Sequence, residues 1–295
     1  MTLSLERILC PVDFSDGSRH ALTHACAIAR TFSAQLSVLH ALAPPVYAAD
    51  PLMAGALVMT AEDHDRVKRD LADFVRGATD GLAVETVIVE ESPVPAVLAH
   101  AESWHADLMV IGTHGRRGFE RLILGSTTER LLRKATCPVL TVPPRAADAT
   151  VGAPVSYARV LCAVDFSAAS LRALEYAAVL ARDLGGRLTL MNVVEPLPVP
   201  DALSLTTSPA LDIEGAACAA MRTRLHEVAP AGLTTDEVVA VGKPYREILT
   251  RAESDRANLI AIGVHGGVTV LPGFLGSTTN HIVREATCPV LSLRA

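Results

Sequence analysis

Lysine is scarce in this chain, and neither of its glycine-rich segments contains one. Lysine stands only at Lys68, Lys134 and Lys243. The Walker A sequence GxxxxGK[ST], whose lysine reaches the terminal phosphates of a bound nucleotide, is absent. The sequences GxSxG and GxGxxG, which mark α/β-hydrolases and dinucleotide-binding dehydrogenases, are absent as well. The sequence therefore offers no familiar machinery for rapid phosphoryl, acyl or hydride transfer.

Cysteine patterns that would mark a metal site or a disulfide framework are also missing. None of the six cysteines stands in a CxxC or zinc-binding spacing. Cys10 and Cys137 recur about 151 residues later as Cys162 and Cys288, each beside an apolar run of strand length. We expect these thiols to be small buried hydrophobes of a protein in a reducing compartment.

Two further classes of protein lack support. The net charge of -6 offers no basic surface for a nucleic acid, so we expect a small ligand. The longest stretch without charged residues, 257–283, contains five glycines and a proline, so we expect no membrane helix. The first residues lead almost directly into a strand-like run without the pattern of a signal peptide, which predicts a cytoplasmic location.

The sequence does contain an internal repeat of two copies. The segment ILCPVDFSDGSRHAL from Ile8 matches VLCAVDFSAASLRAL from Val160, and STTERLLRKATCPVL later matches STTNHIVREATCPVL. An offset of about 151 residues has the size of a whole domain. The expected organisation is a first domain over 1–143, a linker rich in Pro and Ala over 144–157, and a second domain over 158–295.

Each copy alternates apolar runs of strand length with segments of helical period. The strands expected in the first copy are 7–12, 35–41, 82–89, 107–111 and 137–142. Helices are expected between them, the second after an N-cap at Thr60, the third opened by Pro93, and the last over 126–134. Strict alternation implies right-handed crossovers and a parallel sheet with helices on both faces. Ligands of such sheets bind beyond the carboxyl ends of the strands.

The most informative pattern is a glycine spacing that both copies keep: GxxG, nine residues, then Gly-Ser. Its residues are Gly112, Gly115, Gly125 and Ser126 in the first copy, and Gly263, Gly266, Gly276 and Ser277 in the second. Glycine after a buried strand permits a positive φ and the close approach of a ligand. The Gly-Ser pair opens a helix whose first amides and dipole favour an anion, and the hydroxyls of Ser126, Thr127 and Thr128 add donors. The pattern predicts a phosphate cradle in each copy, whereas glycines that only shape the loop are the alternative.

Two other residue types recur at this edge. Asp13 and Asp165 stand in the repeated VDFS, where a carboxylate caps the following helix or accepts a hydrogen bond from a ribose hydroxyl or an adenine amine. Both roles can coexist. His114 and His265 lie inside the glycine segments without a second ligand at metal spacing, so we assign no zinc.

The two glycine segments differ in charge. The first carries Arg116, Arg117 and Arg121, whereas the second is uncharged and contains Pro272. If the arginines reach the phosphates, the first site binds more tightly; if they form a solvated face, the two sites are similar.

Taken together, these motifs resemble those of the universal stress protein family. The resemblance is carried in both copies by VDFS after the first strand, by the glycine spacing after the fourth, and by a closing ATCPVL strand. It covers nearly the whole chain apart from the linker and the termini. It implies an α/β fold of two tandem Rossmann-like domains, of the adenine nucleotide alpha hydrolase-like type. Each would hold a five-stranded parallel sheet in the order 3-2-1-4-5 with helices on both faces.

The resemblance further implies that each copy binds ATP, with the aspartate near the adenosine and backbone of the second and fourth strands lining the base. The residues implied for the first copy are Asp13, Ala41, Ile111, Gly112, His114, Gly115, Gly125, Ser126 and Thr127. Those implied for the second are Asp165, Val193, Ile262, Gly263, His265, Gly266, Gly276, Ser277 and Thr278. Mg²⁺ is compatible with such a ligand because it neutralises phosphates, although Asp13 and Asp165 are the only carboxylates expected there.

Family resemblance also implies pairing of the fifth strands, 137–142 with 288–293, within or between chains, so we expect a homodimer. The leading hypothesis is a cytoplasmic ATP-binding stress or regulatory protein that holds its nucleotide without rapid hydrolysis, and no catalytic residue is assigned. One alternative is a slow ATPase or nucleotide hydrolase in which His114 or Asp13 positions water. Another is a protein-interaction module without nucleotide. AMP and cyclic nucleotides stay open beside ATP.

Overall fold

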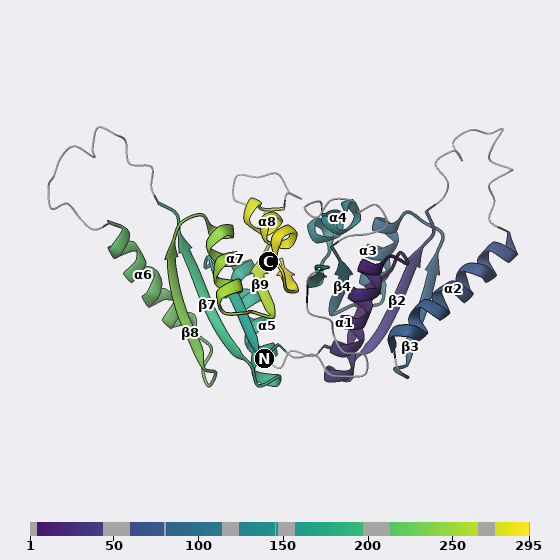
Figure 1. Cartoon of the computed structure of the whole chain (residues 1–295), viewed down its shortest axis with the longest axis horizontal. Helices are drawn as coiled ribbons and strands as arrows, with labels where there is room; N and C mark the ends of the chain where they lie inside the picture. Colours follow the sequence, from purple (N-terminus) through teal and green to yellow (C-terminus); the bar gives the residue numbers. More distant parts are fainter. Residues whose placement is uncertain are drawn as a thin grey trace, which may run out of the picture. The chain divides into compact units, whose positions relative to one another are not determined.

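The computed structural model describes residues 5–43, 60–79, 81–113, 124–144, 146, 157–196, 213–264 and 275–294. The chain divides into two compact units, the first holding β1 to β5 and the second holding β6 to β10 (Figure 1). The elements of the first unit are β1 (Arg7–Pro11), α1 (Asp16–Phe32), β2 (Gln35–Ala41), α2 (Ala61–Thr79), β3 (Val84–Val89), α3 (Pro93–Ser103), β4 (Leu108–Gly112), α4 (Ser126–Lys134) and β5 (Val139–Val142). Those of the second are β6 (Arg159–Ala163), α5 (Ala168–Asp183), β7 (Arg187–Val194), α6 (Ile213–Val228), β8 (Thr235–Val241), α7 (Pro244–Ser254), β9 (Leu259–Gly263), α8 (Ser277–Glu285) and β10 (Val290–Leu293).

Within each unit all strand pairs are parallel. In the first unit β1 pairs with β2 and β4, β2 pairs with β3, and β4 pairs with β5. In the second, β6 pairs with β7 and β9, β7 with β8, and β9 with β10. Each unit therefore has the expected order 3-2-1-4-5, and the α/β prediction is confirmed. The order reverses between the first and fourth strands, which is where such sheets bind ligands.

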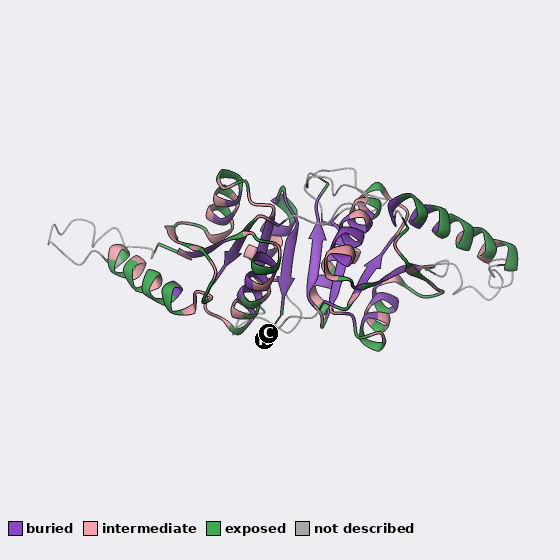
Figure 2. Cartoon of the chain, turned by 90° about the horizontal axis from the view of Figure 1, so that it is seen from below, coloured by how far each residue is buried: buried purple, intermediate pink, exposed green. Residues whose placement is uncertain are grey.

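Helices cover both faces of each sheet because the chain reverses direction across it. The crossovers β1 to β2 and β2 to β3 run one way, so right-handed connections place α1 and α2 on the same face, and these two helices pack together. The crossovers to β4 and β5 run the other way, so α3 and α4 share the opposite face. Figure 2 shows the result: buried strands between helices whose outer faces are exposed.

The apolar core consists of the strands and the inward helix faces. Ile8, Leu9 and Cys10 of β1 are fully buried, and Val160, Leu161 and Cys162 of β6 match them. Burial raises the pKa of the Cys10 thiol well above its ordinary value, so this thiol stays protonated. All six cysteines are free thiols; Cys10, Cys162 and Cys288 are buried as expected, whereas Cys137 is half-buried.

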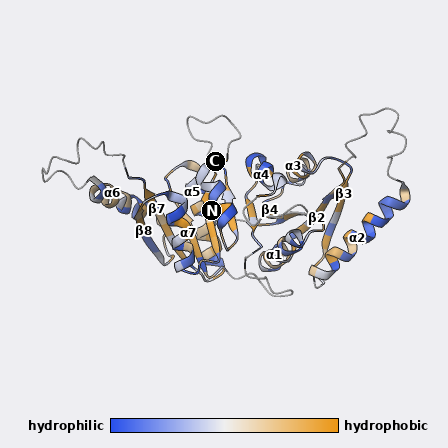
Figure 3. Ribbon diagram, turned by 45° about the horizontal axis from the view of Figure 1, so that its top comes forward, coloured by the Kyte–Doolittle hydropathy of each residue, from blue (hydrophilic) through white to orange (hydrophobic). Residues whose placement is uncertain are grey.

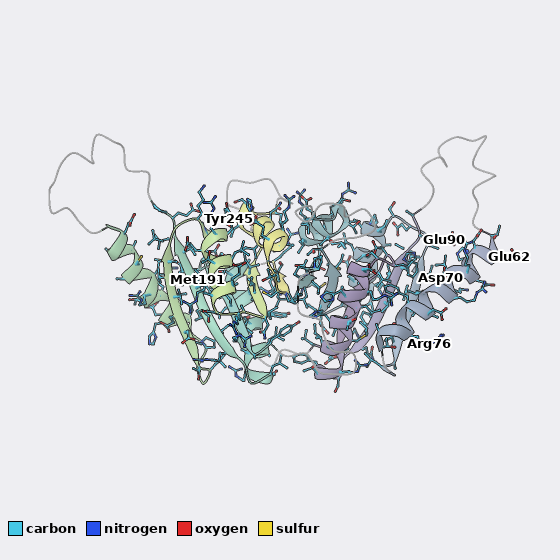
Figure 4. The ribbon with its side chains drawn as sticks, in the orientation of Figure 1. Glu62, Asp70, Arg76, Glu90, Met191 and Tyr245 are labelled. Atoms are coloured by element: carbon cyan, nitrogen blue, oxygen red, sulfur yellow. The ribbon has the colours of Figure 1, made fainter. Side chains whose placement is uncertain are left out.

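Helix α2 packs on the first unit although most of its residues are polar. Figure 3 draws most of it as hydrophilic beside the apolar strands, and in Figure 4 the charged side chains Glu62, Asp70 and Arg76 leave it on the outside. Its start is fixed by a reciprocal cap: the N–H of Asp63 donates to Thr60 Oγ1 at 3.2 Å, and the N–H of Thr60 donates to Asp63 Oδ2 at 3.1 Å. The Thr60 hydroxyl also donates to Asp63 Oδ2 at 2.8 Å, and this bond, followed by that from the N–H of Thr60, lowers the pKa of Asp63. The N-cap predicted at Thr60 is confirmed.

One half-buried polar cluster of the first unit has no counterpart of the same chemistry at the matching described residues of the second unit. The ring of His100 stacks on Trp104, the only tryptophan of the chain, with centroids 5.8 Å apart and 13° between planes. His100 Nε2 lies 3.0 Å from Oγ of the fully buried Ser37. Burial lowers the pKa of His100 below its ordinary value of 6.5, and the charge of Glu85 opposes part of that shift.

We expect the fluorescence of Trp104 to follow the protonation of His100, because a stacked imidazolium quenches an indole. Titration from pH 8 to 4 should show a change with an apparent pKa below 6.5, and His100→Gln should abolish it. Below pH 6.5 the folded chain binds fewer protons at this site than the unfolded chain. The contribution of His100 to the free energy of unfolding is therefore present above pH 6.5 and lost as the pH falls through the lowered pKa. A midpoint above 6.5, or an unchanged titration in His100→Gln, would contradict this assignment.

Candidate functional site

Asp13 lies at the carboxyl end of β1, in a turn that leads directly into α1. Its Oδ1 accepts hydrogen bonds from the N–H of Ser15 at 3.1 Å and from Ser15 Oγ at 2.5 Å. Oγ of Ser15 then accepts from the N–H of Ser18 at 3.2 Å, which makes Ser15 the N-cap of α1. The helix cap therefore belongs to Ser15, and Asp13 orients the capping hydroxyl.

The second unit builds the same turn with the same bonds. Asp165 Oδ1 accepts from the N–H of Ser167 at 3.1 Å and from Ser167 Oγ at 2.5 Å, and Ser167 caps α5 through the N–H of Ser170 at 3.2 Å. In both turns the phenylalanine between Asp and Ser has a left-handed backbone, with φ 64° at Phe14 and 63° at Phe166. Such a φ is costly for a residue with a Cβ, so the surrounding contacts must hold it.

Gly112 ends β4 beside this turn, and the reason for a glycine there differs from the one expected. Gly112 is an ordinary strand residue without the positive φ that we expected. A Cβ at this position would lie 2.7 Å from the carbonyl oxygen of Gly17 and 2.9 Å from its carbonyl carbon, in the first turn of α1. At Gly263 a Cβ would lie 2.5 Å from the N of Ser170 and 2.7 Å from the carbonyl carbon of Ala169. Both glycines let a helix backbone touch the strand end.

Gly125 stands at the N-cap of α4, and Gly276 holds the same place at α8. The N–H of Gly125 donates to the carbonyl of Thr113 at 2.9 Å, which holds the helix start against the end of β4. Among the described residues, no side chain caps either helix, in contrast to the serine caps of α1 and α5. The first amides of α4 and α8 therefore point toward the carboxyl edge of the sheet with their positive dipole ends.

The threonine two positions after the Gly-Ser pair has a structural use. Thr128 Oγ1 donates to the carbonyl of Gly112 at 2.8 Å, and Thr279 Oγ1 donates to the carbonyl of Gly263 at 3.4 Å. Thr128 is buried, so its hydroxyl is not the phosphate donor that we expected. Ser126 and Ser277 are exposed, while Thr127 and Thr278 are half-buried.

The remaining expected residues divide into those that line the edge and those outside the described residues. Ala41 ends β2, and Val193 stands one residue before the end of β7. Ile111 and Ile262 are buried in β4 and β9, each next to the strand-ending glycine. His114, Gly115, His265 and Gly266 lie outside the described residues, as do Arg116, Arg117, Arg121 and Pro272.

The described site residues of each unit come together at one place. Strands β1 and β4 are neighbours in parallel register, so Asp13 and Gly112 follow adjacent strand ends. The first turn of α1 touches Gly112, and α4 begins against Thr113. The edge thus gathers a carboxylate, a strand end without a Cβ and the open N-terminus of a helix. No group of His, Cys, Asp and Glu suited to a metal ion occurs among the described residues.

Sequence reasoning missed the roles of Ser15 and Ser167, although a signal was present. Both belong to the repeated VDFS, and a serine just before a helical segment is a common N-cap. The bond from Thr128 to the carbonyl of Gly112 had no such signal, because it joins a helix to a strand end 16 residues earlier.

Comparison with known proteins agrees with this arrangement. The model of the Universal stress protein family matches the chain twice, at residues 4–143 and 156–294. The chain belongs to the universal stress protein family.

Some relatives in this family match nearly the whole chain, and others match about half of it. A universal stress protein of Mycolicibacterium smegmatis is 29% identical over 294 residues, which is 97% of this chain and 96% of that protein. One from Methanocaldococcus jannaschii is 31% identical over 138 residues, covering 46% of this chain and 81% of that protein. Among solved structures, a universal stress protein from Archaeoglobus fulgidus has a TM-score of 0.68 at 23% identity, with 98% of each chain covered, which shows a shared fold. Within the described part of the chain, no helix has the length and apolarity to cross a bilayer.

We expect alanine at position 112 to destabilise this universal stress protein, because the new Cβ would collide with the backbone of α1. Gly112→Ala should lower the free energy of unfolding by about 2 kcal/mol, in the range of overpacked cores. Gly125→Ala is the matched control: its Cβ would lie 3.3 Å from the carbonyl oxygen of Thr113, and its φ of -57° suits any residue. Urea denaturation of both variants checks this. Equal stability of the two would show that α1 does not require glycine at the strand end.

Proposed function

We propose that this universal stress protein binds ATP at the carboxyl edge of each sheet and holds it without rapid hydrolysis, in a stress-response or regulatory role. The observation that carries the proposal is the uncapped N-terminus of α4 and α8. Each lies beside a strand-end glycine and an aspartate turn, and the same arrangement occurs in both units.

The phosphate side of the proposed site is the start of α4 or α8. A glycine at the N-cap offers no side-chain acceptor to the first amides, so an anion can take that role. Glu129 in the first turn of α4 is paired with Arg133 one turn further on, which offsets its charge. The exposed hydroxyls of Ser126 and Ser277 would add one donor each.

The adenosine side is formed by the aspartate turn and the strand ends. Oδ1 of Asp13 is occupied by Ser15, so the carboxylate has a fixed orientation before any ligand arrives. A carboxylate accepts hydrogen bonds from a ribose hydroxyl or an adenine amine, and it repels phosphates, which favours this orientation of the nucleotide. Ala41 and Ile111 stand near the ends of β2 and β4, the two strands that flank β1, and would line the base.

Holding is favoured over cleavage because the glycine segments contain no lysine to stabilise charge on the terminal phosphate. We further propose a cytoplasmic location, a homodimer, and pairing of the fifth strands within or between chains, since an apolar edge strand favours pairing. If the arginines of the first glycine segment reach the phosphates, the first site binds more tightly than the second.

ATP should raise the melting temperature of the full chain, because a ligand that binds only the folded state stabilises it by mass action. At 100 times the dissociation constant the gain is about 2.7 kcal/mol. Gly125→Trp should remove binding at the first site and Gly276→Trp at the second, since an indole would fill each cradle. Calorimetric titration of the two single-site chains gives the two affinities, with AMP and cyclic AMP as the competing ligands.

The melting temperatures of both tryptophan variants without nucleotide are the control for folding. A wild-type chain that neither melts later with millimolar ATP nor releases nucleotide on acid extraction would overturn the proposal. Single-turnover hydrolysis separates holding from cleavage: product that forms faster in wild type than in the doubly substituted chain would identify a slow ATPase.

A further inference from the structure

A buried polar side chain near the end of the second strand of each unit is unused by the site as described so far. His40 on β2 is 8% exposed, and Asn192 on β7 is 7% exposed. The two residues hold the same place in the repeat, 152 positions apart like Asp13 and Asp165. Because they differ in type, a search for repeated residues passes over them.

Both side chains make the same hydrogen bond. Nδ1 of His40 lies 2.8 Å from the carbonyl oxygen of Val12, and Nδ2 of Asn192 lies 2.7 Å from that of Val164. In histidine and asparagine alike, this nitrogen is bonded directly to Cγ, so one donor position serves both residues. Since a carbonyl can only accept, the Nδ1 of His40 carries the proton.

The carbonyl that receives this bond belongs to the peptide group that precedes the aspartate. The N–H of Val12 already donates to Leu39 at 2.9 Å, and the N–H of Val164 donates to Met191 at 2.8 Å (Met191 is labelled in Figure 4). With both groups of residue 12 tied to β2, the plane of the peptide that ends at the nitrogen of Asp13 is fixed. The aspartate turn therefore starts from one defined direction.

The first unit adds a contact on the other side of the aspartate. The ring of Phe14 lies 4.3 Å from the ring of His40 and 5.4 Å from that of Phe74 on α2. His40 thus touches the residues before and after Asp13, and it helps to hold the left-handed backbone of Phe14. In the second unit the guanidinium of Arg224 on α6 lies 3.9 Å from the ring centroid of Phe166 instead.

We propose that His40 and Asn192 are positioning residues, which set the orientation of Asp13 and Asp165 through the preceding carbonyl. This inference rests on the proposed nucleotide site. It does not place either side chain in contact with the ligand. What matters is a donor on the nitrogen bonded to Cγ, and each unit supplies the conservative substitute for the other.

The test measures ATP affinity in full-length single-site chains. In Gly276→Trp protein, which keeps the first site, His40→Leu should weaken ATP binding roughly tenfold through the lost hydrogen bond. His40→Asn in the same protein should bind within about twofold of the parent, because Asn192 makes this bond in the other unit. In Gly125→Trp protein, Asn192→Asp should weaken binding to a similar extent, because an ionised carboxylate of the same shape cannot donate. Asn192→His in the same protein should keep the ATP affinity of the Gly125→Trp parent, because His40 makes this bond in the other unit.

Melting temperatures without nucleotide accompany each titration, and the asparagine and aspartate variants keep the test decisive if His40→Leu does not fold. A purely structural role would predict no recovery of ATP affinity on exchanging His and Asn. Equal affinity of all variants would overturn the positioning role and leave the proposed function intact. Equal weakening in His40→Leu and His40→Asn would overturn the hydrogen-bond account. Absence of binding by both single-site parents and by the wild type would overturn the inference together with the proposed function.

Discussion

The contact between the end of the fourth strand and the first turn of the first helix constrains everything else at the carboxyl edge. A Cβ at Gly112 would lie only 2.7 Å from the nearest backbone atom of α1, and a Cβ at Gly263 only 2.5 Å from the nearest backbone atom of α5. This approach puts the N-terminus of one helix against the strand from which the glycine segment departs. It also determines where α4 and α8 begin, because Thr128 and Thr279 bond back to the carbonyls of the same glycines.

Two helices of each unit begin at this edge, and their N-termini differ in capping. The starts of α1 and α5 are capped by serines whose hydroxyls are held by Asp13 and Asp165. The starts of α4 and α8 have glycine at the cap and face the same edge without a side-chain acceptor among the described residues. A capped helix needs no anion, whereas an uncapped one favours it. The difference is therefore what gives the proposed nucleotide its direction, with phosphates toward α4 or α8.

The two units share this backbone arrangement while their supporting side chains have diverged. His40 and Asn192 reach the same carbonyl with different side chains. The cluster of His100 and Trp104 is replaced in the second unit by Arg251, whose Nε bonds Asp255 Oδ2 at 2.6 Å. At both places an imidazole of the first unit, whose ordinary pKa lies near neutrality, is replaced by a side chain that does not change charge there. Duplication thus kept the backbone geometry, and the chemistry around it changed.

The sequence by itself determined the repeat, the alternation of strands and helices, and the sheet edge at which Asp13 and Gly125 lie. Those properties depend on periodicity and on the handedness of crossovers, which are local rules. The strand order was implied only by the resemblance to the universal stress protein family. Strand limits moved by one or two residues, as at β4, which includes Gly112 because this residue pairs with Val142 of β5. Only the tertiary structure decided why Gly112 is glycine, that the Thr128 hydroxyl bonds the carbonyl of Gly112, and that His40 holds the carbonyl of Val12. Each of these contacts joins atoms from two segments that are separated in the sequence, so no residue spacing within one segment reveals it.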